Sequence, residues 1–361
     1  MASGDFGHVQ PYIDYFVDKG HEVYFIALSP SPNRKVRTIN VWRGSVSTFN
    51  IKTQKWKYVF AGMRARHVIK RLKPDVVNAH YATSGGLAGW LSGHKRLIIT
   101  VHGSDVNIAL NSPIWRCLIR IFFKQAKLIH VVSDELMHRV RELGIPVHKI
   151  INCNVGINFD QFYINRIVST EYFAELRMVC NRAFEPLYDH LTIVNALEIV
   201  KSEGIPFTIC FIGDGSLMTV VKNRVRYCGL EKHVSFLGYV PNKDQVSIFK
   251  NNNIYISASH SDGTSLSLLE AMASGLLPVV TSINANCSLL ECNETAMMFQ
   301  PADYSNMAST LIKLYRECPI NVSKAIDRNQ QLANELGNRS RNMRKIEDAF
   351  NQCAHNSSFG G

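Results

Sequence analysis

The chain contains 361 residues, of which 46% are hydrophobic and 10% aromatic, so it can bury two domain cores. Its 40 Lys and Arg residues outnumber 29 Asp and Glu residues, which gives a formal net charge of +11. Charged residues interrupt the longest apolar runs before they reach the length of a bilayer span, which argues against a membrane-spanning protein.

Short apolar runs alternate with helical patterns along the chain, and this alternation predicts the α/β class with doubly wound parallel sheets. The first series of strands is expected at residues 22–28, 36–41, 75–78, 97–101, 128–132 and 149–153, with helices at 8–19, 60–72, 84–92, 114–125 and 133–143. The second series is expected at residues 176–181, 206–212, 234–237, 253–257, 277–281 and 296–299, with helices at 189–203, 216–228, 243–250 and 265–274.

Two domains follow from this pattern, because residues 154–175 show no clear period. We expect a Rossmann-like N-terminal domain at residues 1–155 and a linker at residues 156–175. A second Rossmann-like domain is expected at residues 176–335, followed by a C-terminal helix and tail at residues 336–361.

The nine cysteines are scattered and include no Cys-x-x-Cys pair. This usage favours reduced thiols in a cytoplasmic protein. It also offers no metal-ligand spacing, so we expect no metal site.

Positive charge is concentrated in the first half of the chain. Residues 1–150 hold 22 Lys and Arg residues against 9 Asp and Glu residues. Much of the excess lies in residues 52–73, where aromatic residues and Met63 are interleaved with Lys and Arg. Such a stretch fits an amphipathic helix on an anionic membrane surface. A solvated helix face is the alternative, whereas no nucleic-acid-binding motif accompanies the charge.

Residues 259–275 place two carboxylates, Asp262 and Glu270, eight positions apart across a loop that leads into a helix. Amides at the start of a helix are available to anions or sugar oxygens, so the backbone of Gly263, Thr264, Ser265 and Leu266 is a candidate binding element. The alternative is that Asp262 only caps the helix while Glu270 lies on its solvated face.

Several other polar positions follow expected strands, at the sheet edge where α/β proteins bind ligands. They are His80, the segment His102-Gly103-Ser104-Asp105, Arg182, Gly213 and the segment Gly238-Tyr239-Val240. A histidine at such a position can also be a purely structural hydrogen-bonding residue.

These motifs resemble those of retaining GT-B glycosyltransferases, specifically glycosyltransferase family 4. The resemblance covers nearly the whole chain and implies two Rossmann-like domains that face a central cleft. Asp262 stands where the family usually has Glu, and the companion Lys of the family is absent near Arg182, so Tyr188 or a backbone amide is expected in its place.

The resemblance implies a role for each position. Asp262 would hold hydroxyls of the donor hexose, Glu270 the ribose, and the Gly263–Leu266 amides hexose and phosphate oxygens. Arg182 would neutralise the donor diphosphate, and His102 would face the reacting sugar. Gly213, Gly238, Tyr239 and Val240 would contact the nucleotide, and His80 and Asp105 are candidates for the acceptor side.

The N-terminus departs from the family pattern. Residues 3–8 resemble the glycine-containing loop of relatives, with Gly4 on the donor side, but no apolar strand precedes them. We therefore expect the first strand of the N-terminal sheet to be missing and the first half of the chain to fold poorly as written.

The resemblance predicts a metal-independent enzyme without a cofactor that moves a hexose from a nucleoside diphosphate sugar to a glycan or lipid-linked glycan. Peripheral contact with the inner face of a membrane is expected, and nucleic acid is not. Two alternatives stay open: a non-catalytic partner subunit that binds a sugar nucleotide, and another GT-B enzyme such as a sugar-nucleotide epimerase or a glycoside phosphorylase.

Overall fold

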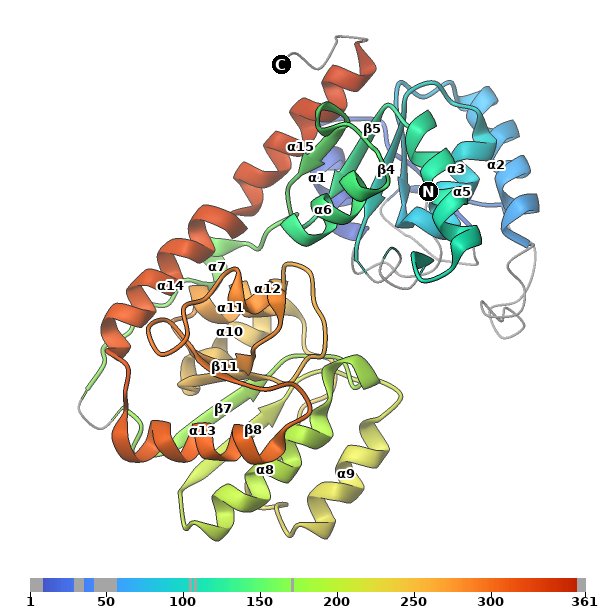
Figure 1. Cartoon of the computed structure of the whole chain (residues 1–361). Coiled ribbons are helices and arrows are strands. Elements are labelled where there is room, and N and C mark those ends of the chain that lie inside the picture. The colour runs from blue at the N-terminus through green and yellow to red at the C-terminus, as the bar shows by residue number, and fades with distance from the viewer. Residues whose placement is uncertain are drawn as a thin grey trace. The chain divides into compact units, whose positions relative to one another are not determined.

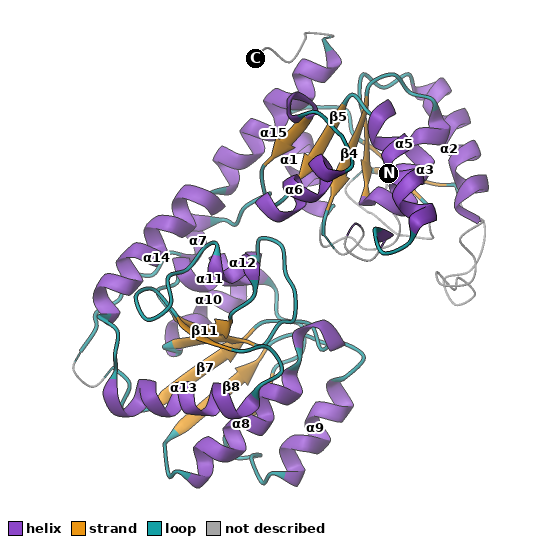
Figure 2. Cartoon of the chain, viewed as in Figure 1, coloured by secondary structure: helices purple, strands orange, loops and turns teal. Residues whose placement is uncertain are grey.

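The structure is a computed structural model that describes residues 9–28, 36–41, 57–103, 106, 109–169 and 172–355. The chain divides into two compact units (Figure 1). The first unit falls within residues 1–155 and 340–361, and the second comprises residues 156–339. Each unit combines helices with parallel strands (Figure 2), which confirms the expected α/β class.

The second unit is built on one six-stranded parallel sheet with the order β12-β11-β10-β7-β8-β9. Its strands are β7 (Leu176–Cys180), β8 (Phe207–Phe211), β9 (Val234–Phe236), β10 (Ile254–Ser257), β11 (Leu277–Thr281) and β12 (Met297–Phe299). The strand order reverses between β7 and β10. Their carboxyl ends therefore lie side by side at a topological switch point, where open α/β sheets bind ligands.

Helices cover both faces of this sheet. They are α7 (Phe159–Phe162), α8 (His190–Ser202), α9 (Met218–Tyr227), α10 (Asn242–Asn251), α11 (Leu266–Ala273), α12 (Asn284–Cys287), α13 (Tyr304–Glu317) and α14 (Val322–Gly337). Successive strand residues alternate between the two faces. Met178 packs in the core with α8, α9 and α13, whereas Val179 packs with α7, α11 and α14.

The first unit contains a four-stranded parallel sheet of order β3-β4-β5-β6 and a separate parallel pair, β1-β2. The strands are β1 (Tyr24–Ala27), β2 (Arg37–Asn40), β3 (Val77–His80), β4 (Leu97–Val101), β5 (Leu128–Val131) and β6 (Ile150–Asn152). The helices are α1 (Gln10–Asp18), α2 (Lys57–Leu72), α3 (Gly86–Ser92), α5 (Pro113–Gln125), α6 (Asp134–Glu142) and α15 (Arg339–Ala354).

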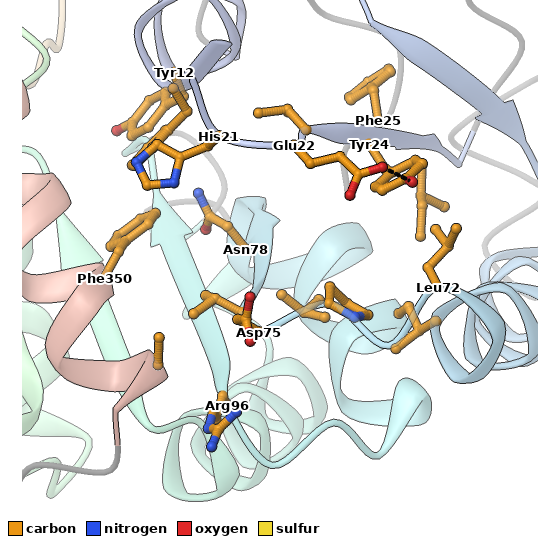
Figure 3. Close-up of a pocket in the computed structure, with 18 of the residues that line it drawn as sticks. Tyr12, His21, Glu22, Tyr24, Phe25, Leu72, Asp75, Asn78, Arg96 and Phe350 are labelled. Carbon is orange, nitrogen blue, oxygen red and sulfur yellow. Dashed lines mark hydrogen bonds between the residues drawn. The ribbon is translucent and has the colours of Figure 1, made fainter. Parts of the chain in front are cut away.

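A cavity separates β1 from β3. No ladder joins these two strands in the described part of the chain. The space between them has a volume of about 740 Å³ and is lined by β1, β3, α1 and α15. Figure 3 shows Glu22 and Tyr24 on one side of the cavity, across from Asp75 and Asn78.

The C-terminal helix α15 packs within the first unit. Phe350 stacks on Phe16 of α1 with ring centroids 5.5 Å apart. Beside this pair, the Tyr15 hydroxyl donates a 2.7 Å hydrogen bond to the Glu347 carboxylate. The last helix of the chain therefore belongs to the core of the first unit.

Two expected elements differ from the structure. Residues 156–175 belong to the second unit and include α7. The helix expected at residues 84–92 begins as α3 at Gly86, because residues 81–85 form a single π-helical turn. This turn brings Gly85 so close to the His80 carbonyl that a Cβ atom would lie only 1.9 Å from the oxygen. None of the helices in the described ranges has the length and apolar character to cross a bilayer.

Candidate functional site

The switch point of the second unit brings three of the predicted side chains together. Arg182 follows β7, and Asp262 and Ser265 lie in the loop between β10 and α11. The Arg182 guanidinium donates to the Asp262 carboxylate and, at 2.9 Å, to the Ser265 hydroxyl. Two segments that are 80 residues apart in sequence thus meet in one polar cluster.

Arg182 is a buried cation that its neighbours hold in place. Its side chain is 8% exposed, and the aromatic ring of Tyr188 lies 4.1 Å from the guanidinium carbon. Burial is the largest single influence and lowers the pKa of Arg182, but the charge of Asp262, with smaller contributions from Tyr255, Tyr188 and Cys180, raises that pKa above its usual value. Its Nε atom has no hydrogen-bond partner among the residues that the structure describes. The site therefore keeps a permanent positive charge with a spare donor.

Ser265, and not Asp262, caps helix α11. The Ser265 hydroxyl accepts the Leu268 N–H at 3.2 Å, while the Asp262 carboxylate accepts the Gly263 N–H at 3.0 Å. The alternative of a simple Asp262 cap is therefore wrong. Thr264 is half-buried in the same loop, and Leu266 begins the helix. The loop presents a turn of backbone amides next to the Arg182 cluster, at the positive end of the α11 dipole.

Glu270 is a buried carboxylate that two amide side chains hold. Its residue exposure is 6%, which excludes the alternative of a solvated helix face. Asn242 donates to Oε1 at 2.9 Å, and Asn181 donates to Oε2 at 3.3 Å. Burial raises the pKa of Glu270 to about 7, although Arg339, Asn181 and Arg182 act in the opposite direction. The carboxyl group is thus poised to change its charge near neutral pH.

The loops after β8 and β9 close the same edge of the sheet. The Gly213 N–H donates to the Gly238 carbonyl at 2.8 Å. Gly213 has a φ of +131°, and a Cβ there would lie 2.7 Å from the Arg182 carbonyl oxygen, so this position requires glycine. The Val240 carbonyl accepts from Gln245 at 2.8 Å, and Tyr239 is 81% exposed.

Some members of this cluster had no clear signal in the sequence. Gln245 accepts from Asn181 at 3.0 Å, and Asn181 and Asn242 hold Glu270. Asn181 could have been found, because it directly follows a strand and precedes Arg182. Asn242 and Gln245 lie on α10, and only the packing of that helix against β7 brings them to the site.

In the first unit, the structure brings His80 and His102 together. His80 ends β3 and is 3% exposed, and His102 follows β4. Nδ1 of His80 and Nε2 of His102 are 3.0 Å apart. The predicted positions Gly4 and Asp105 lie outside the described residues. No group of three His, Cys, Asp or Glu side chains within the described ranges could hold a metal ion.

Two family models match successive parts of the chain. The model described as Glycosyltransferase Family 4 matches residues 8–161. The model described as Glycosyl transferases group 1 matches residues 175–332, the segment that contains Arg182, Asp262 and Glu270.

Similar proteins are known at low sequence identity. The N-acetyl-alpha-D-glucosaminyl L-malate synthase of Bacillus anthracis is 22% identical over 83% of this chain and 81% of the relative. A UDP-Gal:alpha-D-GlcNAc-diphosphoundecaprenol alpha-1,3-galactosyltransferase of Escherichia coli is 24% identical over 73% of this chain and 72% of the relative. The solved sucrose-phosphate synthase of Thermosynechococcus elongatus is 14% identical with a TM-score of 0.79, and 99% of each chain is covered.

Proposed function

This chain is a glycosyltransferase of family 4 with the GT-B fold, and we propose that it transfers a hexose with retention from a nucleoside diphosphate sugar to a hydroxyl of a glycan or lipid-linked glycan. The observation that carries this proposal is the cluster of Arg182, Asp262 and Ser265 at a sheet switch point, beside the buried carboxylate of Glu270. The name of the Escherichia coli relative above, which includes a diphosphoundecaprenol-linked acceptor, supports the acceptor class.

The second unit offers a complementary group for each part of such a donor. Glu270 accepts hydrogen bonds from the ribose hydroxyls, and Gly213 with the Gly238–Val240 loop contacts the nucleobase. Arg182 and the amides of Gly263–Leu266 bind the diphosphate, and Asp262 holds hexose hydroxyls. Each contact is charge-assisted or made to a backbone group that the fold already positions.

The reaction in this proposal needs no protein nucleophile. The bond between the sugar C1 and the phosphate oxygen breaks while the acceptor oxygen bonds to C1 on the same face. The acceptor proton passes to the departing phosphate oxygen. Arg182 and the α11 amides stabilise the negative charge that grows on the diphosphate, so catalysis is electrostatic. Because these groups supply the positive potential, we expect turnover without a metal cofactor.

The same proposal includes a location for the enzyme. A lipid-linked acceptor would be made at the cytoplasmic face of a membrane, and helix α2 supplies a surface suited to peripheral contact with that membrane. Arg64, Arg66, Lys70 and Arg71 are exposed on α2, together with Phe60 and Met63. The enzyme would therefore meet its acceptor at the inner leaflet without spanning the bilayer.

Incubation of the chain with a panel of nucleotide sugars, scored for release of nucleoside diphosphate, tests the proposal. We expect release from one donor class to rise when lipid-linked glycan is added. In the same assay, the variant Glu270→Gln removes the carboxylate proposed to bind the ribose. Its matched control is Glu317→Gln, which changes an exposed carboxylate at the end of α13. If the chain binds a donor but releases no nucleoside diphosphate with any acceptor, the proposal is wrong and the chain is a non-catalytic sugar-nucleotide-binding subunit.

A further inference from the structure

A row of polar side chains crosses the sheet of the first unit. His80 on β3 is in register with Thr100 on β4, and Thr100 is in register with His130 on β5. All three are buried, with exposures of 3%, 0% and 0%. Parallel register places their side chains on the same face of the sheet, so the row is a continuous polar path inside an apolar core.

Hydrogen bonds join this row to His102. The Thr100 hydroxyl lies 2.8 Å from Asn78 Oδ1, and Asn78 Nδ2 lies 3.1 Å from His80 Nε2. The other nitrogen of His80, Nδ1, lies 3.0 Å from His102 Nε2. At the opposite end, His130 Nε2 lies 2.6 Å from the Cys153 carbonyl.

The His130 end sets the direction of the path. A carbonyl oxygen can only accept, so His130 carries its proton on Nε2. Burial lowers the pKa of His130 to about 4, so the ring is neutral and its Nδ1 is an acceptor. The Tyr12 hydroxyl lies 3.3 Å from that Nδ1. Burial raises the pKa of Tyr12, so the hydroxyl stays protonated and donates a hydrogen bond to Nδ1.

Each later donor then follows from the one before. With Tyr12 serving His130, the Thr100 hydroxyl donates to Asn78 Oδ1, its shorter contact. Asn78 therefore turns its NH₂ group toward His80 and donates to Nε2. His80 must carry its proton on Nδ1, and that proton is donated to His102 Nε2.

We propose that this relay holds His102 as a neutral imidazole with its proton on Nδ1, so that His102 acts as an N–H donor to an oxygen atom and not as a base. Thr100, Asn78 and His80 are positioning residues that act through His102. The tautomer follows from the geometry of the first unit alone. That the oxygen belongs to a donor sugar or its phosphate rests on the proposed function.

Long-range ¹H–¹⁵N correlation spectra of the full chain labelled with ¹⁵N-histidine, recorded at about pH 8, test the tautomer without any substrate. The His102 resonances are identified by their loss in His102→Gln. We expect a pyrrole-type shift for His102 Nδ1 and a pyridine-type shift for Nε2. A protonated Nε2 in the wild-type chain would overturn the proposal.

Two variants test the path to His102. The carboxylate of Asn78→Asp can only accept, so it should force the His80 proton onto Nε2 and move the His102 proton from Nδ1 to Nε2. Thr100→Val removes the hydroxyl and should populate both His102 tautomers, whereas Thr100→Ser is the matched control and should keep Nδ1–H. A His102 tautomer that is the same in all three folded variants contradicts the relay. Because these readouts need no glycosyl transfer, a failed activity assay does not affect them.

Discussion

At the residue scale, burial of Glu270 has two opposing consequences. In the native state the Glu270 carboxyl has a pKa of about 7 and keeps its proton up to about that pH. In the unfolded chain the same group has a pKa of 4.5 and loses its proton at lower pH. Between these values the native state binds more protons than the unfolded state, so stability falls as pH rises through this window. The ionised form that costs stability is the form that, in the proposed function, accepts hydrogen bonds from ribose hydroxyls.

We therefore predict that Glu270→Gln has opposite effects on binding and stability. Nucleotide affinity should fall by about 1.5–3 kcal/mol, because a charge-assisted acceptor is lost. In the wild type, the Glu270 carboxyl makes the free energy of unfolding decrease between about pH 5 and 7. This decrease should be absent in the variant. Titration calorimetry and urea unfolding across that range measure both. Unchanged affinity would remove Glu270 from the site, and Glu317→Gln should leave both quantities as in the wild type.

Arg182 gives the second prediction at this scale. Arg182→Ala should lower turnover by roughly tenfold or more, because the diphosphate carries more charge in the transition state than in the ground state. It should also cost stability, since Asp262 and Ser265 lose their partner. Initial rates of nucleoside diphosphate release measure the effect, with Arg328→Ala on the exposed face of α14 as the control. Wild-type turnover would mean that the phosphates are held elsewhere.

At the element scale, the sequence located most strands because each is a continuous apolar run between turn residues. It also singled out Asp262 and Glu270 by their spacing and Arg182 by its position after a strand, and the structure brings Arg182 and Asp262 together. It could not place Asn242 or Gln245, whose role depends on how α10 packs on β7. The sequence also could not predict the π-helical turn at residues 81–85 or the register that aligns His80, Thr100 and His130. Both depend on how separate segments approach one another.

Helix α2 has two faces of different character. Tyr58, Ala61, Ala65 and Ile69 are buried in the core of the first unit. The opposite face exposes basic side chains beside Phe60 and Met63, which are about half exposed (50% and 49%). A face that combines cationic and large apolar residues suits the headgroup region of an anionic bilayer.

We predict that the chain binds anionic vesicles more tightly than neutral ones and is released by salt. Each Lys or Arg near the surface should contribute about 1 kcal/mol at low ionic strength. Lys70→Glu with Arg71→Glu should abolish cosedimentation with the vesicles. Lys313→Glu with Arg328→Glu makes the same charge change on exposed positions of α13 and α14, and should not. Equal binding to both kinds of vesicle would leave the charge without a membrane role.

At the scale of the whole molecule, the two units differ in the continuity of their sheets. Among the described residues, the second unit has six strands in one sheet, whereas those of the first unit form two sets with a cavity between β1 and β3. The space left open by this cavity deprives the surrounding side chains of packing contacts, which lowers the free energy needed to open the first unit. The chain should therefore unfold in two steps, with the first unit opening before the second.

Intrinsic fluorescence can separate these steps, because all four tryptophans of the chain precede residue 120. Trp90 and Trp115 pack against the core of the first unit, so their emission should change when that unit opens. Far-UV circular dichroism of the whole chain should show a second transition at a higher urea concentration, when the second unit unfolds. An extended segment of about five to eight Val, Ile and Leu residues, joined ahead of residue 1, should enter the cavity and bury its side chains between β1 and β3. Each large side chain that it buries contributes about 1.5–3 kcal/mol, so the fluorescence midpoint should rise toward the second transition. The same segment with alternate residues changed to Asp is the control, and coincident transitions in the unextended chain would show that the divided sheet costs the first unit no stability.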